Sequence, residues 1–369
     1  MNFEEKHFTN APAADEFELS IFGPGVGESL VMHLGDGDWY VIDSCRLPGE
    51  DSPVALAYLE AMNINPGDAI KGVLATHWHD DHVKGLSQIV RRCPDARFTM
   101  SAALASDEFN ELVFEIEEKN KCVAASASST ASELADILER VADSKQSPPS
   151  YASDGSMLYR KEHPYAVELI ALSPSGATIQ NAFKSIASKL SPNSSVQKFT
   201  KLSPNDLSVA VQLSTPNHDL LLKADLENCK HPHQGWNAVL KSAVRPKKQS
   251  SVVKVGHHGS SNADSNEVWQ NMVLPNATGV VTPYSKLRSP LPSGNDVARI
   301  KKRGVNLNCT TWPPSVKPPR RRGVDGAIFG AVKSRRALNR RPGFIRLRFS
   351  LIPGISAISV ERFGSATQL

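Results

Sequence analysis

The chain has 369 residues, of which 40% are hydrophobic and 22% charged, a composition typical of a globular protein and not of a disordered one. Its five cysteines are an odd number and include no CxxC pair, so neither a disulfide framework nor a structural zinc knuckle is expected. The N-terminus is acidic where a signal peptide would be basic, and no apolar run approaches the roughly 18 residues that cross a bilayer. We therefore expect a cytoplasmic protein that does not associate with membranes.

Short β-prone runs separated by glycine-rich turns open the chain, and apolar runs of strand length then alternate with helical spacing. Strands are predicted at residues 18–22, 29–34, 39–43, 70–76, 97–100, 166–172, 207–213, 220–224 and 252–255. Helices are predicted at residues 53–62, 84–92, 236–244, 266–272 and 295–303. Strands that come first in a meander and later alternate with helices indicate a layered α/β domain.

Two further segments depart from this alternation. Residues 103–145 have the pattern of two amphipathic helices joined by an Ala- and Ser-rich stretch, which we interpret as a helical insertion. Residues 311–322 contain four prolines, which exclude regular structure there, and residues 346–351 and 355–361 predict a final β-hairpin. The chain therefore divides into a main domain of residues 1–310 and a Pro- and Arg-rich extension of residues 311–369.

The strongest chemical signal is the motif HxHxDH at residues 77–82, directly after a predicted strand and before a predicted helix. It supplies His77, His79, Asp81 and His82, and imidazole and carboxylate groups are ligands for zinc and related divalent metals. Alternate residues of a turn point to one side, so His77 and His79 can share one metal while Asp81 and His82 face a second. A histidine-rich surface loop is the alternative, and the flanking strand and helix argue against it.

Two more predicted strands end in residues that bind metals. The apolar run at 220–224 is followed by Asp225, and the run at 252–255 is followed by His257 and His258. A carboxylate that follows a strand is more often a turn residue or a helix cap when it occurs alone. Three strand ends that carry such side chains together predict one metal-binding rim of a sheet.

The order of these motifs resembles the metallo-β-lactamase superfamily, and most closely the hydrolase domain of competence-type DNA-uptake channel proteins. The resemblance runs from about residue 18 to about residue 303 and includes the HxHxDH motif, the strand that ends in Asp225, and His257-His258-Gly259-Ser260. It implies a four-layer αββα sandwich, to which the sequence adds the helical insertion and a basic C-terminal extension. Three sequence features depart from the family: Ala224 stands where Gly often precedes the bridging Asp, only His163 and His218 lie where many branches supply a further ligand His, and the membrane channel of the competence proteins is not expected here.

The resemblance also implies a binuclear site with two divalent metal ions, zinc in the first instance and manganese or iron as alternatives. It assigns His77 and His79 to one ion, Asp81 and His82 to the other, and Asp225 to a bridge. Either His257 or His258 completes the site, with His258 favoured. The other expected roles are substrate contacts for Asn205, Ser208, Lys254 and Ser260, and a hydrogen bond from Asp43 to a ligand histidine.

Metals in such a site lower the pKa of a bound water to about 7, and the hydroxide attacks phosphorus or a carbonyl carbon with Asp81 as the catalytic group. The segment from residue 317 to 348 holds eleven Lys or Arg residues and one acid, which favours a phosphodiesterase or nuclease. The expected nucleic-acid contacts are Arg320, Arg321, Arg322, Arg335, Arg336, Arg340 and Arg341. The alternatives are a solvated basic segment, a hydrolase of lactones, thioesters or cyclic nucleotides, and a non-catalytic interaction module stabilised by metal.

Overall fold

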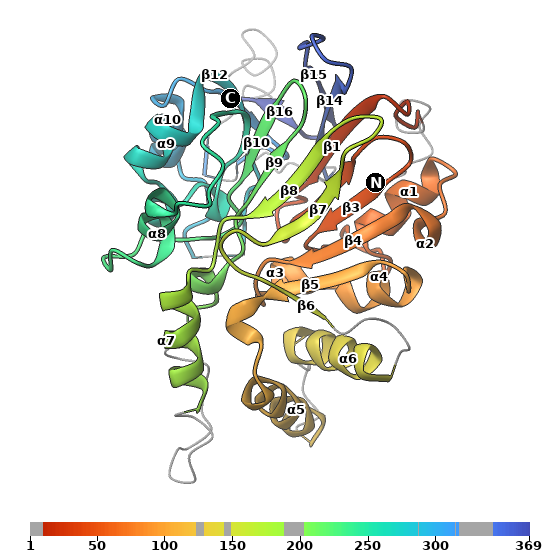
Figure 1. The fold of residues 1–369 in the computed structure, drawn as a ribbon, viewed down its shortest axis with the longest axis vertical. Helices are drawn as coiled ribbons and strands as arrows, with labels where there is room; N and C mark the ends of the chain where they lie inside the picture. Colours follow the sequence, from red (N-terminus) through yellow and green to blue (C-terminus); the bar gives the residue numbers. More distant parts are fainter. Residues whose placement is uncertain are drawn as a thin grey trace, which may run out of the picture.

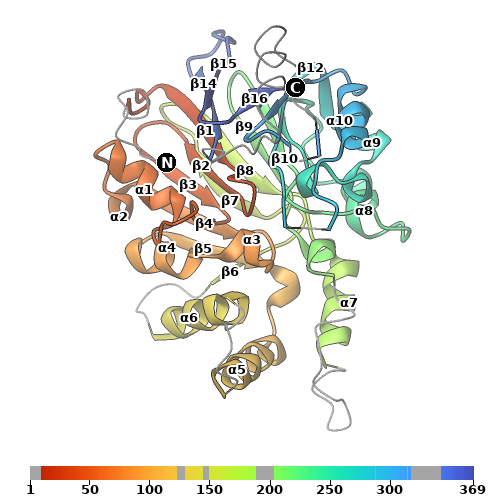
Figure 2. The ribbon, with the colours of Figure 1, turned by 180° about the vertical axis from the view of Figure 1, so that it is seen from behind.

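Two eight-stranded sheets packed face to face form the centre of the molecule (Figure 1). The computed structural model describes residues 10–122, 129–143, 149–187, 203–286, 288–313, 315–316 and 342–369. Helices cover the outer face of each sheet, with α1, α2 and α4 on one side and α8, α9 and α10 on the other, as the view from behind also shows (Figure 2). The predicted four-layer αββα sandwich is confirmed.

The first sheet has the strand order β15-β14-β1-β2-β3-β4-β5-β6. Its strands are β1 (Glu16–Phe22), β2 (Ser29–His33), β3 (Trp39–Ile42), β4 (Ile70–Ala75), β5 (Arg97–Ser101), β6 (Ser150–Ala152), β14 (Phe344–Ser350) and β15 (Ser359–Phe363). Strands β3 to β6 are parallel. Parallel strands place their carboxyl ends at one edge of a sheet, which is where open α/β sheets bind ligands.

The second sheet has the strand order β16-β13-β12-β11-β10-β9-β8-β7. Its strands are β7 (Met157–Lys161), β8 (Val167–Ala171), β9 (Val211–Ser214), β10 (Asp219–Leu222), β11 (Ser250–Lys254), β12 (Val273–Val281), β13 (Asn306–Cys309) and β16 (Thr367–Gln368). Strands β10 to β13 are parallel. The second sheet therefore also gathers several strand ends at one edge.

The helices that cover and connect the sheets are mostly short. They are α1 (Val54–Ala61), α2 (Pro66–Ala69), α3 (Asp80–Val83), α4 (Leu86–Arg92), α5 (Asp107–Cys122), α6 (Ser129–Asp143), α7 (Gly176–Ala187), α8 (Gly235–Lys241), α9 (Asn266–Met272) and α10 (Gly294–Lys301). Four 3₁₀ turns are η1 (Ala102–Leu104), η2 (Pro204–Leu207), η3 (His257–Gly259) and η4 (Ser261–Ala263). None of the helices in the described ranges is long and apolar enough to cross a membrane.

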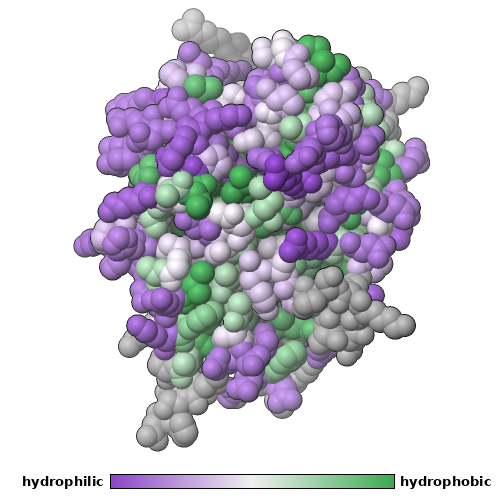
Figure 3. All heavy atoms as spheres, in the orientation of Figure 1, coloured by the Kyte–Doolittle hydropathy of each residue, from purple (hydrophilic) through white to green (hydrophobic). Residues whose placement is uncertain are grey.

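Three hydrophobic clusters hold the four layers together, because strand side chains alternate between the two faces of each sheet. In β2, for example, Leu30 and Met32 face the second sheet, whereas Val31 faces the helices of the first sheet. A third cluster, which includes Trp236 and Trp269, lies between the second sheet and α8 to α10. On the face shown in Figure 3, hydrophilic side chains predominate and apolar ones form small groups.

The predicted helical insertion corresponds to α5 and α6, and α6 packs directly on the helix that follows the HxHxDH motif. Glu133 of α6 accepts hydrogen bonds from the backbone N–H groups of Gly85 and Ser87 at the start of α4, at 2.6 and 3.0 Å. These N–H groups have no partner within the helix. The insertion therefore supports the local structure of the motif.

The end of the chain is integrated into the sandwich. Strand β14 pairs with β1 over seven residues, from Glu16 opposite Ser350 to Phe22 opposite Phe344, and with β15 on its other side. The predicted hairpin is thus confirmed, and it lies within the first sheet rather than beside the main domain. Arg346 and Arg348, at the end of the basic segment, form ion pairs with Glu361 and Glu18.

Other elements differ from the sequence-based expectation. The strand predicted at 207–213 begins later, at Val211, because residues 204–207 form η2. Strands β7, β12 and β13 and helix α7 were not predicted. Strand β12 contains Pro275 and Asn276, and Asn276 has a positive φ of 61°, so its sequence does not have the pattern of a regular strand.

Candidate metal centre

The predicted metal ligands come together at the edge where the two sheets meet. His77 and His79 follow β4, Asp81 and His82 lie in α3, and Asp225 follows β10. His258, in η3, follows β11. These segments are far apart in the sequence, and parallel strand pairing in each sheet brings their ends to one place.

Hydrogen bonds on the far side of each ring determine which nitrogen faces the cluster. Nδ1 of His82 donates to Oδ2 of Asp43 at 2.7 Å, so Nε2 carries the free lone pair. Nδ1 of His258 lies 3.0 Å from the carbonyl oxygen of Thr282, which can only accept a hydrogen bond. Its Nε2 therefore also carries the lone pair. Such bonds are the usual way in which proteins orient metal-binding histidines.

His77 is oriented through an intermediate hydroxyl. Oγ1 of Thr76 donates to Oδ2 of Asp43 at 2.7 Å and lies 3.0 Å from Nδ1 of His77. Because that hydroxyl has already given its proton to Asp43, it accepts from His77. Nε2 of His77 then faces Nδ1 of His79 at 3.1 Å.

The lone pairs of these histidines point to two carboxylates. Oδ2 of Asp225 lies 3.9 Å from Nε2 of His77, 3.4 Å from Nε2 of His82 and 3.7 Å from Nε2 of His258. Oδ2 of Asp81 lies 3.0 Å from Nε2 of His258 and 3.6 Å from Nε2 of His82. We call His77 and His79 the first donor group. Asp81, His82 and His258 form the second donor group. Asp225 lies between the two groups.

Two buried atoms of this cluster have no hydrogen-bond partner among the residues that the structure describes. They are Nε2 of His82 and Oδ1 of Asp225, and both residues are almost fully buried. Unsatisfied buried polar atoms are rare in folded proteins and require an explanation such as an ion. Both atoms are Lewis bases of the types that bind zinc, so the residues present fit divalent metal ions.

The electrostatics of the cluster also favour a cation. Burial opposes protonation of His82, but the carboxylates of Asp225, Asp81 and Asp43 outweigh it and place the pKa of His82 well above its ordinary value. Burial likewise opposes ionisation of Asp225, yet His82 and His258 hold its pKa well below the usual range. Positive charge is therefore stabilised at the centre of the cluster, and a bound divalent ion would supply it.

A pocket of about 440 Å³ opens onto the donor groups. The lining residues that the structure describes are Trp78, His79, Asp80, Asp81, Thr130, Asp225, His257, His258 and Tyr284. Tyr284 stacks on the ring of His258, with ring centroids 5.1 Å apart. The aromatic rings of Trp78 and Tyr284 give the pocket apolar wall surface beside its metal donors.

His257 lines this pocket, and Asn205, which is not among the described lining residues, lies beside it, apart from the donor groups. Nδ1 of His257 lies 2.9 Å from Oδ1 of Asn262 and 3.3 Å from Oε1 of Glu227. Nδ2 of Asn205 donates to the same carboxylate at 2.7 Å. The geometry therefore places His258 among the metal donors and His257 in a separate hydrogen-bonded group with Glu227.

The other predicted substrate contacts lie outside the pocket lining. Ser208 is fully buried behind the cluster, where its hydroxyl accepts from the backbone N–H of Asp225 at 3.2 Å. Lys254 is 1% exposed and its ammonium contacts Glu28, and Ser260 is half-buried in the loop after His258. The seven arginines predicted to bind nucleic acid lie outside the described residues.

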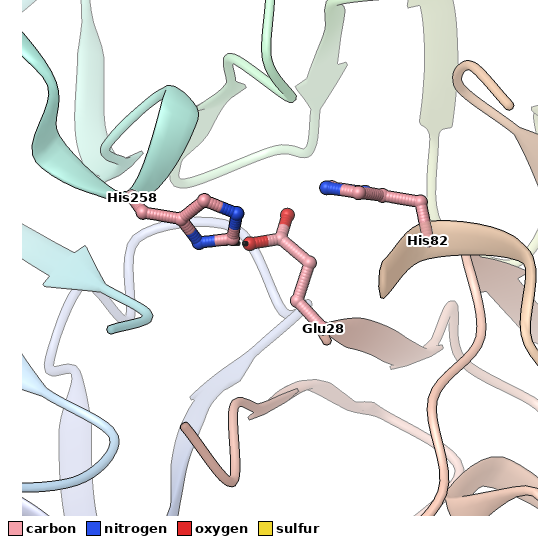
Figure 4. Close-up of side chains that lie close together, drawn as sticks. All are labelled: Glu28, His82 and His258. Atoms are coloured by element: carbon pink, nitrogen blue, oxygen red, sulfur yellow. Dashed lines mark ion pairs between the residues drawn. The ribbon is translucent and has the colours of Figure 1, made fainter. Parts of the chain in front are cut away.

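Glu28 was not identified from the sequence. It lies just before β2 and is 1% exposed, and Figure 4 shows its carboxylate between the imidazoles of His258 and His82. Its carboxylate and those two rings offer ligand atoms within 4.8 Å of one another. The sequence offered one signal for a buried acidic residue near the site. Lys254 is a single charge at the end of an apolar strand, and a buried lysine needs an anionic partner.

Positive φ angles turn the chain sharply at two of the strand ends. Ala224 has φ of 43°, and His257 and His258 have φ of 45° and 52°. This backbone region disfavours residues that carry a Cβ atom. The left-handed conformation at Ala224 explains why glycine suits the position before the bridging aspartate.

The comparisons with known proteins agree with this architecture. A model of the metallo-beta-lactamase superfamily matches residues 22–119, the segment that contains the HxHxDH motif. The family binds divalent metals, often zinc. None of the curated proteins compared with the chain matches it.

Solved structures show distant likeness. The metallo-beta-lactamase fold protein YhfI from Bacillus subtilis is 9% identical with a TM-score of 0.38, over 79% of this chain and 96% of that one. The metallo-beta-lactamase SMB-1 is 14% identical with a TM-score of 0.33, over 71% and 85%. The rubredoxin oxygen:oxidoreductase from Desulfovibrio gigas is 10% identical with a TM-score of 0.30, over 59% and 42%. Because these TM-scores lie below 0.5, the fold is assigned from the chain's own strand order and from the family match.

Proposed function

We propose that the chain hydrolyses phosphodiester bonds. The premise is that an αββα sandwich with this donor set is a metal-dependent hydrolase of the metallo-β-lactamase type. The observation that carries the hydrolase assignment is a pair of buried atoms at the centre of the cluster, Nε2 of His82 and Oδ1 of Asp225, that lack a hydrogen-bond partner among the described residues. Two divalent ions, held by the first and second donor groups with Asp225 between them, would activate a water and polarise the substrate.

The protein side chains supply the remaining chemistry. Asp81 lines the pocket, and His82 and His258 keep its pKa below the ordinary value in spite of its burial, so it is ionised at neutral pH. A carboxylate there would accept a hydrogen bond from the attacking water and orient it towards the substrate. His257, on the pocket wall and anchored by Glu227, is placed to bind an oxygen of the substrate.

The phosphodiester assignment rests on the basic segment and on where it begins. Oγ of Ser315 donates to the carbonyl of Pro290 at 2.9 Å, and the neighbouring Leu291 pairs with Tyr284, which lines the pocket. The basic segment starts at Lys317, two residues after Ser315 in the sequence. Since Ser315 contacts Pro290, next to the Leu291–Tyr284 bridge, we propose that the polyanion bound by this segment is also the substrate of the pocket.

A second candidate is a small-molecule hydrolase that acts on lactones, thioesters or cyclic nucleotides. It is favoured by the pocket itself, because none of the described lining residues is Lys or Arg, while Trp78 and Tyr284 supply aromatic surface. The pocket volume of about 440 Å³ lies in the range typical of small-ligand sites.

A cleavage assay separates the two candidates. Metal-free protein is reconstituted with zinc or manganese and incubated with single- and double-stranded DNA and RNA, a chromogenic phosphodiester, a lactone and a thioester. Asp81→Asn is compared with Asp68→Asn, a surface aspartate of α2 whose loss leaves the pocket unchanged. Metal-dependent cleavage of a polynucleotide by the wild type and Asp68→Asn, but not by Asp81→Asn, is the expected result.

Hydrolysis of only the lactone or the thioester would replace the first candidate by the second. Turnover of the chromogenic phosphodiester without cleavage of any polynucleotide would keep the phosphodiester chemistry and remove polynucleotides as the substrate. Binding of metal without turnover of any substrate would overturn both and leave a metal-stabilised interaction module. Cleavage that persists in Asp81→Asn would remove Asp81 from the proposed chemistry.

A further inference from the structure

A buried ion pair crosses from one sheet to the other beside the metal centre. The ammonium of Lys254, at the end of β11 in the second sheet, lies 2.7 Å from Oε1 and 2.6 Å from Oε2 of Glu28, just before β2 in the first sheet. Both side chains are 1% exposed. The pair is therefore withdrawn from solvent and joins the two halves of the sandwich where the donor groups meet.

Glu28 contacts both segments that carry the second donor group. Its backbone N–H donates to the carbonyl of Asp81 at 2.9 Å. Its Oε2 accepts from Oγ1 of Thr282 at 2.5 Å and lies 3.8 Å from Nδ1 of His258. Because the carbonyl of Thr282 is the acceptor for His258, the backbone of Glu28 holds Asp81 while its side chain holds the partner of His258.

The ion pair argues against Glu28 as a metal ligand. Both of its oxygens contact the ammonium of Lys254, and one also accepts from Thr282. A metal on Glu28 would have to displace a buried cation from its only ionic partner among the described residues. Glu28 therefore contacts the residues that hold Asp81 and His258 in place and does not bind a metal itself.

The loop that carries His258 needs such support. His257 and His258 have positive φ angles of 45° and 52°, and this conformation persists in residues other than glycine only when the surroundings impose it. The Glu28–Lys254 pair attaches the start of this loop to the first sheet, and Thr282 attaches the His258 ring.

We propose that Glu28, neutralised by Lys254, is a positioning residue that sets the separation of Asp81 and His258 and so determines the affinity of the second donor group for its metal. This inference rests on the proposed function, because it assumes that each donor group holds an ion. It predicts an effect on one of the two ions and not on both.

The test measures metal stoichiometry and affinity by equilibrium dialysis against graded free zinc, with elemental analysis of the protein. Removal of one partner leaves an unpaired buried charge, so the main variant is the double substitution Glu28→Gln/Lys254→Met. Thr282→Val, with Thr282→Ser as the conservative rescue, tests the same contact without a change of charge. The matched control is Glu18→Gln/Arg348→Met, an ion pair between β1 and β14 of the first sheet in which Glu18 is fully buried and Arg348 is 13% exposed.

The expected result is a 10- to 100-fold weaker binding of one zinc ion in the double variant and in Thr282→Val, with the other ion unchanged. The control and Thr282→Ser bind both ions as the wild type does. Unchanged affinity for both ions in the two test variants, or equal weakening of both, would overturn the inference and leave the proposed function intact. A wild-type protein that binds no zinc would overturn both.

Discussion

Oδ2 of Asp43 accepts a hydrogen bond of 2.7 Å from Nδ1 of His82, and the same oxygen accepts from the hydroxyl of Thr76 at 2.7 Å. Through Thr76 the carboxylate also orients His77. One buried aspartate thus determines which nitrogen two imidazoles, one from each donor group, present to the metals. From the sequence we expected Asp43 to hydrogen-bond a ligand histidine, and in the structure its carboxylate accepts a hydrogen bond from His82.

Asp43→Asn is expected to weaken metal binding by about 10- to 100-fold, because the neutral amide is a poorer acceptor for the His82 ring and for the Thr76 hydroxyl that orients His77. Asparagine tolerates the positive φ of 58° at this position, so the backbone is preserved. The affinity is measured by competition with a chromophoric chelator. Asp36→Asn is the matched control, since Asp36 has φ of 55° in an exposed turn. Equal affinities of the two variants would contradict the role of Asp43.

Ala224→Gly is expected to stabilise the fold. A left-handed conformation costs a residue with a Cβ atom roughly 1–2 kcal/mol, and glycine removes this cost. The greater freedom of glycine in the unfolded chain offsets about 0.5–1 kcal/mol of the stability gained in this way. The net increase in the free energy of unfolding is therefore about 0.5–1 kcal/mol, or a rise in melting temperature of roughly 1–3 °C.

Thermal unfolding of the metal-free protein measures this effect without a contribution from bound ions. Ala210→Gly is the control, because Ala210 is fully buried and is not among the described residues with positive φ. It should lower the melting temperature. A loss of stability in Ala224→Gly as large as that in Ala210→Gly would show that the left-handed backbone carries no cost here.

Removal of metal is expected to destabilise the wild type. A ligand at 100 times its dissociation constant adds about 2.7 kcal/mol to the free energy of unfolding when it binds only the folded state. Zinc should therefore raise the melting temperature of the wild type by several degrees, and a chelator should reverse the rise. Asp225→Asn should abolish most of this shift, because Asp225 lies between the two donor groups.

Asp219→Asn, in the same strand β10, should keep the full shift, since Asp219 contacts Ser214 away from the cluster. Calorimetric scans with and without zinc give both values. If Asp225→Asn kept the zinc-dependent rise, Asp225 would not be a ligand.

His33 is expected to make stability depend on pH. Burial lowers the pKa of His33 from 6.5 to about 4. The hydrogen bonds of the folded protein require the neutral ring, because Nδ1 lies 2.7 Å from the carbonyl of Glu16 and Nε2 accepts from the N–H of Gly37 at 3.0 Å. The unfolded chain therefore binds a proton more readily than the folded one. Stability from this residue is present above pH 6.5 and is lost as the pH falls towards 4.

At pH 5 the loss from His33 amounts to about 2 kcal/mol. Denaturant unfolding of the metal-free protein at pH 7 and pH 5 measures it. His33→Gln keeps a donor and an acceptor but does not titrate, so its loss of stability between these pH values should be smaller by about that amount. An identical loss in the wild type and in His33→Gln would contradict the assignment.

The sequence by itself determined the elements whose signals are local. The HxHxDH motif, the apolar strands that end before Asp43, His77 and Asp225, and the helix at 266–272 could all be predicted, because side-chain periodicity and strand length are encoded within a few neighbouring residues. The order of those elements indicated a layered α/β domain, and the resemblance to the metallo-β-lactamase superfamily implied the αββα layering. Strand β12, with its proline and its positive φ at Asn276, lacks such a local signal and was missed.

Only the tertiary structure decided between residues that look alike in the sequence. His257 and His258 are adjacent and of one type, and a turn with two positive φ angles directs His258 to the donors and His257 to Glu227. Lys254 looked like a surface contact for phosphate and is instead buried against Glu28, which comes from the other sheet and is distant in the sequence. Burial and partnership depend on which strands pack together, and that information belongs to the whole fold and not to any one segment.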